Sequence, residues 1–128
     1  MVNFTYRNSP CLQAAAAYIA RGGIGRVMHV EASYLQSWLA QAAWGDWRTD
    51  PTWTWRLSTK HGSGGVLGDV GCHIYDLVSF LCGDMSVIDC RLKSFSKGVA
   101  RNRIGPYVLD ANDSFFSTVT FANGGMGT

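Results

Sequence analysis

The sequence predicts an α+β fold with a largely antiparallel open sheet, helices packed on one face, and a chain that stops before the final strands. Three observations support this prediction. Two stretches repeat apolar residues at the helical period, and four stretches alternate apolar and polar residues as half-buried strands do. Glycine and proline separate most of these stretches, as expected at the ends of helices and strands.

Composition narrows the class of protein. A chain of 128 residues with 47% hydrophobic residues can bury a core, and we expect one domain over residues 1–128. The net charge of +2 is too small to predict nucleic acid or an anionic membrane as a partner. No apolar run approaches the roughly 20 residues of a membrane span, and no signal pattern begins the chain.

The cysteines indicate a reducing compartment. None of the four forms a C-x-x-C pair, and each lies among apolar residues. We therefore expect reduced, mostly buried thiols rather than a disulfide framework, and a cytoplasmic location. The cysteines are Cys11, Cys72, Cys82 and Cys90.

The first part of the chain predicts a strand, a helix and a second strand. Val2–Arg7 alternates, so it is typical of a short strand. A helix should follow, with a cap at Asn8 or Ser9, Pro10 in its first turn and Gly22-Gly23 at its end. The second strand should run from Arg26 to Tyr34. Its buried face would carry Met28, Val30, Ala32 and Tyr34, and its exposed face His29, Glu31 and Ser33.

The segment from Leu35 to Lys60 has no clear period, which indicates a functional loop or a lid. It contains every tryptophan of the chain, together with Arg48 and Arg56. Indole faces and guanidinium groups suit a sugar or another polyol, which makes Arg56 a candidate substrate-binding residue. An aromatic mini-core or a subunit contact fits equally well. The tryptophans are Trp38, Trp44, Trp47, Trp53 and Trp55.

The stretch from Val66 to Cys82 predicts an amphipathic helix that ends before Gly83. At about 100° per residue, a second stripe carries polar side chains away from the apolar one. The apolar stripe is Ile74, Leu77, Val78 and Leu81, and the second is Asp69, His73, Asp76 and Phe80. Repeated glycines indicate that backbone or ligand comes very close. These glycines are Gly64, Gly65, Gly68 and Gly71.

Asp69 and His73 are the candidate catalytic residues. A carboxylate one turn from an imidazole can orient the ring and favour its protonated form, which suits proton transfer near neutral pH. The residues alone also fit a structural role, in which Asp69 caps the helix and His73 makes a structural hydrogen bond. A third interpretation adds Asp76, because two carboxylates and an imidazole could bind a metal.

The end of the chain predicts two more strands. Val87–Phe95 and Ser114–Phe121 alternate, and the basic residues between Arg91 and Arg103 fit a solvated strand face and loop. Asn123-Gly124 is a strong hairpin signal. The sequence stops three residues after Gly125, so we expect no return strand and a truncated chain.

Several motifs resemble a known family over nearly the whole chain. The sequence is similar to the C-terminal domain of the glucose-fructose oxidoreductase, inositol dehydrogenase and rhizopine-catabolism (Gfo/Idh/MocA) oxidoreductases. The resemblance implies an NAD(P)-dependent dehydrogenase of sugars, polyols or related small molecules, often oligomeric through its open sheet. The motifs are Asn3–Arg7, Gly22–Gly25, Tyr34-Leu35-Gln36, Trp55-Arg56, Gly64–Asp76, Gly83 and Phe121–Gly124.

By this resemblance, Asp69 and His73 match the family's active-site residues, with His73 as acid and base on the substrate oxygen. Further residues fall where they could face substrate. These are Tyr6, Arg7, Tyr34, Gln36 and Trp38.

The chain also departs from the family. It lacks the Glu-Lys-Pro segment and the glycine-rich dinucleotide fingerprint of an N-terminal Rossmann domain. We therefore expect NAD or NADP in the full-length protein, no cofactor bound to this chain, and no turnover by it alone. We expect a small-molecule substrate and a homo-oligomer through the sheet face. A non-catalytic dimerisation or ligand-binding module is the alternative.

Overall fold

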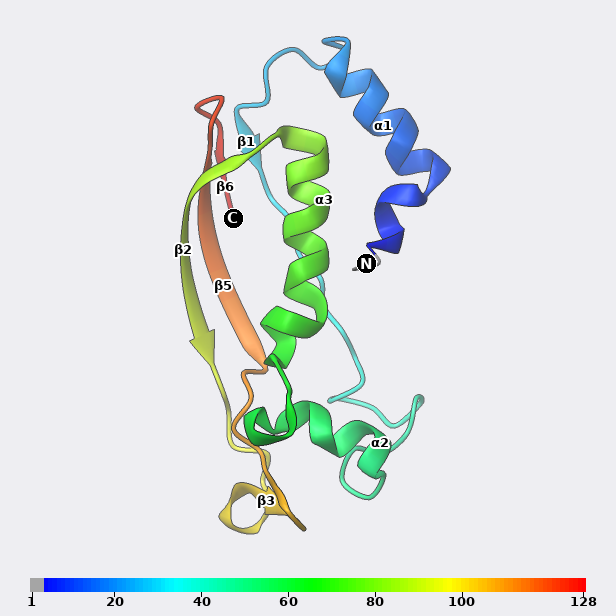
Figure 1. Ribbon diagram of the computed structural model, residues 1–128, viewed down its shortest axis with the longest axis vertical. Coiled ribbons are helices and arrows are strands. Elements are labelled where there is room, and N and C mark those ends of the chain that lie inside the picture. The colour runs from blue at the N-terminus through cyan, green and yellow to red at the C-terminus, as the bar shows by residue number, and fades with distance from the viewer. Residues whose placement is uncertain (1–3) are drawn as a thin grey trace. The chain divides into compact units, whose positions relative to one another are not determined.

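The computed structural model describes residues 4–128 and has the predicted α+β class, with helices, a mixed sheet and a small antiparallel sheet. The chain packs as two compact units. The first contains residues 4–33 together with Cys72–Cys90 and Phe116–Thr128, and the second contains Tyr34–Gly71 and Arg91–Phe115. Figure 1 shows the path of the chain, with α3 in green and the strands β5 and β2 in orange and yellow-green.

The first helix is confirmed. Helix α1 spans Pro10–Ala20 with Pro10 in its first turn. Gly22 has a φ of +82°, the left-handed conformation that glycine adopts without steric cost. The amide of Gly23 donates to the carbonyl of Tyr18 at 2.9 Å, and that of Gly22 to Ile19 at 2.9 Å. This pair of bonds is a Schellman motif, so the predicted glycine stop ends the helix.

The strand predicted over Val2–Arg7 is wrong where the structure describes it. Residues 1–3 lie outside the described residues, and Thr5–Asn8 forms the 3₁₀ helix η1. Alternation produces a strand only where a neighbouring strand supplies hydrogen bonds. Here η1 instead packs on α3, which spans Cys72–Cys82.

The central helix is present but not uniform. Leu67–Gly71 is a π-helix, η4, and the α-helical turns of α3 follow it. A π-helix turns by fewer degrees per residue than an α-helix, so the 100° spacing assumed for the polar stripe does not apply across it. Gly83 ends α3 with a φ of +97° and donates to the carbonyl of Ser79 at 3.0 Å, as predicted.

The main sheet has the strand order β1-β6-β5-β2. Its strands are β1, His29–Val30; β6, Met126–Gly127; β5, Ser114–Phe121; and β2, Met85–Lys93. β5 and β6 are antiparallel, with Thr120 opposite Met126, whereas β1 and β6 are parallel. The sheet is therefore mixed, because its first strand pairs with a strand of the same direction.

Two predictions about these strands need correction. A return strand does form after Asn123-Gly124, because the two residues of β6 are enough to pair with both β5 and β1. For the same reason, the strand predicted from Arg26 to Tyr34 shrinks to β1, since β6 offers only two residues as a partner. Met28, expected on the buried face, is exposed.

The second unit has a small aromatic core. Trp47, Leu57 and Leu109 are buried together, and Trp38 and Trp53 pack against them. Short helices replace the expected irregular loop: α2 is Pro51–Thr54, η2 is Trp55–Leu57 and η3 is Thr59–His61. Farther along the chain lie η5, Ala100–Asn102, and the hairpin of β3, Arg103–Ile104, and β4, Tyr107–Val108.

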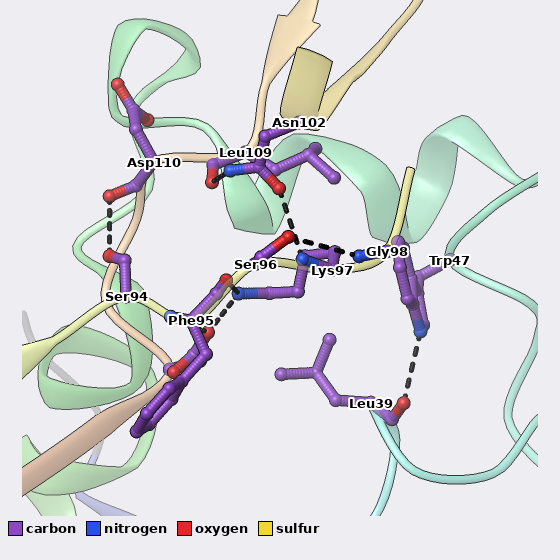
Figure 2. A network of polar contacts seen from close by, with 11 residues as sticks. Leu39, Trp47, Ser94, Phe95, Ser96, Lys97, Gly98, Asn102, Leu109 and Asp110 are labelled. Carbon is purple, nitrogen blue, oxygen red and sulfur yellow. Dashed lines mark hydrogen bonds and ion pairs between the residues drawn. The ribbon is translucent and has the colours of Figure 1, made fainter. Parts of the chain in front are cut away.

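A polar network holds the segment between β2 and β5. Lys97 forms an ion pair with Asp113, and the two side chains are 8% and 7% exposed. The Lys97 ammonium also donates to the carbonyl of Phe95 at 2.7 Å, and its amide donates to the Oδ1 atom of Asn102 at 3.2 Å (Figure 2). Lys97 is thus buried, contrary to the solvated basic loop that was predicted. Arg91, Arg101 and Arg103 are exposed, as expected.

The cysteines are all free thiols, but they are not mostly buried. Cys11 and Cys90 are exposed, and Cys72 and Cys82 are half-buried. Cys11 is exposed because it lies on α1, a helix in which no residue is fully buried. Over residues 4–128, no helix is long and apolar enough to cross a membrane.

Asp110 makes the stability of the second unit depend on pH. Its carboxylate accepts from the amide of Thr59 at 2.8 Å and from the hydroxyl of Thr59 at 2.9 Å. The hydrogen bond from the Thr59 amide is the main cause that lowers the pKa of Asp110, whereas burial of the carboxylate acts to raise it. A lowered native-state pKa contributes stability above the unfolded pKa, and this contribution is lost as pH falls through the native value.

We therefore expect Asp110→Asn to lower the free energy of unfolding by at most about 1 kcal/mol at neutral pH, because the group is exposed. The difference from wild type should shrink as the pH falls below the ordinary aspartate pKa and through the lowered pKa of the native carboxylate. Urea unfolding of the chain over a pH series measures this, with the exposed Asp89→Asn as the matched control. A difference that grows on acidification would contradict the assignment.

Candidate active site

His73 lies near the start of α3, within the first unit. Its ring makes edge-to-face contacts with Phe4, at 5.8 Å between centroids, and with Tyr6, at 5.1 Å. The Nδ1 atom is buried and has no hydrogen-bond partner among the described residues. The rings of Phe4 and Tyr6 therefore flank the imidazole, and its Nδ1 atom is shielded from solvent.

Arg7 and Asp76 form an ion pair beside this histidine. The Nε atom of Arg7 donates to the Oδ2 atom of Asp76 at 2.9 Å, and its Nη2 atom donates to Oδ1. The guanidinium also lies 5.1 Å from the centroid of the Phe80 ring. The hydrogen bond to Asp76 raises the pKa of Arg7 above its ordinary value. Arg7, predicted to bind substrate, thus has a carboxylate of its own chain as its partner.

Asp69 lies in the second unit, on the π-helix η4. Its Oδ1 atom accepts from the Nη1 atom of Arg56 at 2.7 Å, and both side chains are about one-third exposed. The Arg56 guanidinium lies 5.4 Å from the centroid of the Trp53 ring and 5.1 Å from that of Trp55. Two indoles and one carboxylate therefore fix this cation in place.

The other predicted substrate residues also belong to the second unit. Tyr34 is half-buried and Gln36 is exposed. Trp38 packs on Trp53 with 5.8 Å between ring centroids, at the edge of the aromatic core. The mini-core interpretation therefore holds for Trp38, Trp47 and Trp53, whereas Trp44 is 69% exposed and Trp55 is 37% exposed.

At three of the four repeated glycines, an added Cβ atom would lie close to backbone or side chains of the second unit. A Cβ atom on Gly64 would lie 3.1 Å from the Cα atom of Gly68, and one on Gly71 would lie 3.1 Å from the Phe115 ring. A Cβ atom on Gly65, which has a φ of +63°, would lie 2.5 Å from the carbonyl oxygen of Asn112. The space over Gly64, Gly65 and Gly71 is thus filled by protein, whereas a Cβ atom on Gly68 would meet nothing within 4 Å among the described residues.

Asn112 is a residue that sequence analysis missed. Its Oδ1 atom accepts from the amide of Leu67 at 3.0 Å, its Nδ2 atom donates to the carbonyl of Gly64 at 3.1 Å, and its carbonyl accepts from Val66 at 2.8 Å. Asn112 thus fixes the turn that leads into Asp69. No local signal could have found it, because its partners lie more than 40 residues earlier in the chain.

We expect Gly65→Ala to destabilise the chain by about 2 kcal/mol or more, because a left-handed alanine costs about 1–2 kcal/mol and Asn112 leaves no room for a methyl group. Gly68→Ala is the matched control, since a Cβ atom there meets nothing within 4 Å among the described residues. Chemical denaturation of both variants gives the comparison. If the two variants were equally stable, position 65 would not require a residue without a side chain.

The structure brings the predicted site residues together in two groups. Tyr6, Arg7 and His73 belong to the first unit, and Arg56 and Asp69 to the second. The joint action of Asp69 and His73 therefore stays a prediction. Over residues 4–128, no cluster of three metal-ligating side chains occurs, and Asp76 is already paired with Arg7.

Comparison with known proteins gives a consistent result. The model of the GFO/IDH/MocA C-terminal domain family matches residues 12–128. A levoglucosan dehydrogenase from Pseudarthrobacter phenanthrenivorans is 30% identical over 143 aligned residues, which cover 100% of this chain and 34% of that protein.

Solved structures of oxidoreductases also match the chain. A levoglucosan dehydrogenase in complex with NADH and levoglucosan is 29% identical, with a TM-score of 0.74, over 99% of this chain and 32% of that one. An oxidoreductase domain protein from Kribbella flavida is 36% identical, with a TM-score of 0.76, over 97% of this chain and 31% of that one. The chain thus spans about a third of the length of the relatives that it matches.

Proposed function

Because the chain belongs to the GFO/IDH/MocA family, as its C-terminal domain, we propose that it is the substrate domain of an NAD(P)-dependent dehydrogenase. The substrate is a sugar, a polyol or a related hydroxyl or carbonyl compound. The observation that carries this proposal is the setting of His73, with its ring held by Phe4 and Tyr6 and its Nδ1 atom buried.

The proposed chemistry of this chain is proton transfer. Oxidation of a hydroxyl to a carbonyl removes a hydride from the carbon, which bound NAD(P)⁺ would accept, and a proton from the oxygen. An imidazole is suited to accept this proton near neutral pH. His73 is the proposed acid and base, through Nε2, and Asp69 is the second proposed catalytic residue. The sequence lacks the glycine-rich dinucleotide fingerprint, so the proposal places NAD or NADP in a separate nucleotide-binding domain of the full-length protein.

The substrate class is supported by the side chains and by the relatives. Related structures contain levoglucosan or L-sorbose, both small hydroxylated molecules. In this chain, Trp55 and Arg56 offer a partly exposed indole and a guanidinium, which suit C–H faces and hydroxyl groups. Tyr6, Arg7, Tyr34, Gln36 and Trp38 remain proposed contributors to substrate binding.

The proposal includes a homo-oligomer in a cytoplasmic protein. Phe116 and Met126 are 60% and 59% exposed. Both side chains lie on one face of the sheet. Met126 pairs with Thr120, and Thr120 lies four residues after Phe116 along β5, so alternation places the two on the same face. Light scattering should give a multiple of the subunit mass for the two-domain protein and a monomer for Phe116→Asp. Dimerisation without any turnover would favour the alternative, a non-catalytic module.

The test joins this chain to the part of the levoglucosan dehydrogenase that lies outside the aligned 34% of that protein, which would supply the nucleotide-binding domain of the proposal. The joined protein should reduce NAD or NADP in the presence of at least one compound from a panel of anhydrosugars, sugars and inositols. The chain alone should give no turnover. If the joined protein folds and binds NADH but turns over no member of the panel, the proposed function is wrong.

A further inference from the structure

The pairing of Arg7 with Asp76 is more specific than a surface contact. Two nitrogens of the guanidinium bind the two oxygens of one carboxylate, and the Phe80 ring lies beside it. The Asp76 side chain is 10% exposed, so the pair is partly shielded from water. Bidentate pairs of this kind hold geometry as well as charge.

The helical segments η1, α1 and α3 carry few charged residues near His73. Besides His73, the segments η1, α1 and α3 carry only Arg7 and Asp76 as charged side chains. The other titratable groups there are Cys11, Tyr18, Cys72, Cys82 and the phenols of Tyr6 and Tyr75. The Arg7–Asp76 ion pair is therefore the charged contact between η1 and α3.

The ion pair of Arg7 and Asp76 lies close in sequence to the residues that contact each other at the His73 ring. Tyr6 precedes Arg7 on η1, and His73 lies three residues before Asp76, which is about one turn of α3. We propose that Arg7 and Asp76 are positioning residues for His73: their ion pair docks η1 on α3 so that Tyr6 and Phe4 fix the plane of the imidazole. This inference rests on the proposed function, because it assigns a purpose to the orientation of His73.

The alternative is that Arg7 binds substrate directly. Its side chain is 40% exposed, so a ligand could reach it. The two roles differ in what Asp76 contributes. If Arg7 binds substrate, its loss should mainly raise KM, and an aspartate at position 7 could not replace it. If Arg7 and Asp76 position His73, their loss should mainly lower kcat, and exchanging the two residues should preserve the ion pair and its effect.

The test uses four variants of the joined two-domain protein: Arg7→Met, Asp76→Asn, the exchanged pair Arg7→Asp with Asp76→Arg, and the control Arg21→Met. Arg21 also lies over an aromatic ring in the first unit, 4.9 Å from the centroid of Tyr18. We expect each single variant of the pair to lower kcat roughly 10- to 100-fold with little change in KM, because a small misplacement of a catalytic group is costly. The exchanged pair should recover most of the loss, and Arg21→Met should match wild type.

The pH profile of kcat/KM gives a second readout that a merely structural role would not move. Arg7→Met leaves a carboxylate near His73, so the profile should shift to higher pH. Asp76→Asn leaves a cation there, so the profile should shift to lower pH. Thermal melts of every variant establish that folded protein is compared.

Three results are informative. If both single variants keep wild-type kcat and pH profile while His73→Gln is inactive, the positioning role is wrong and the proposed function stands. If Arg7→Met raises KM alone and the exchanged pair does not recover, Arg7 binds substrate and the inference is overturned. If His73→Gln is fully active, the proposed function itself fails.

Discussion

Replacing His73 with glutamine should lower kcat of the joined two-domain protein roughly 10²- to 10⁴-fold, the usual contribution of a general acid or base. Glutamine keeps a polar side chain of similar length, but it cannot accept and return a proton. The rings of Phe4 and Tyr6 contact the imidazole edge-to-face, which favours a defined orientation of this side chain. Steady-state assays at saturating nucleotide and substrate measure the loss.

The matched control is Ser79→Ala, a change of a small polar residue on the same helix. It should keep wild-type kcat, and both variants should melt within a few degrees of wild type. If His73→Gln retained most of its turnover while remaining folded, then the histidine would have a structural role, as sequence analysis left open.

Breaking the ion pair of Lys97 and Asp113 should have the largest effect on stability. Both side chains are buried, and the amide of Phe95 donates to the same carboxylate oxygen at 3.0 Å. Removing one partner leaves the other charge buried without compensation, which typically costs about 3–5 kcal/mol. We expect Lys97→Met or Asp113→Leu to lose this much free energy of unfolding, measured by denaturant titration.

The double variant tests the cause. Lys97→Met combined with Asp113→Leu removes both charges, so it should be more stable than either single variant. Asp46→Asn is a control for an exposed pair, because Asp46 and Arg48 are 39% and 55% exposed and should contribute less than about 1 kcal/mol. Additive losses in the double variant would show that the two charges do not depend on each other.

Elements with local signals could be predicted from the sequence. Helix α1 follows from Pro10 and the glycines that end it, and α3 from its apolar period and Gly83. The strand expected at Val2–Arg7 was wrong over its described residues, because alternation does not reveal whether a partner strand exists. The π-helix Leu67–Gly71 could not be predicted either, since local periodicity assumes a uniform turn.

In the candidate site, single residues could be predicted from the sequence but their long-range contacts could not. His73 and Asp69 stand out in the sequence because a short motif contains both, although their roles are still proposed. The two ion pairs of the site could not be found, because Arg7 lies 69 residues from Asp76 and Arg56 lies 13 residues from Asp69. Such pairs depend on how distant segments pack, and neither charge nor spacing along the chain indicates them.

The most direct measurement of the central claim is rescue of His73→Ala by imidazole in the joined two-domain protein. If His73 transfers the proton, turnover should be lost in the variant and should return in a saturable manner as imidazole is added. Wild type should not respond. Full turnover of His73→Ala without imidazole, or loss that imidazole does not restore in folded protein, would contradict the proposed role.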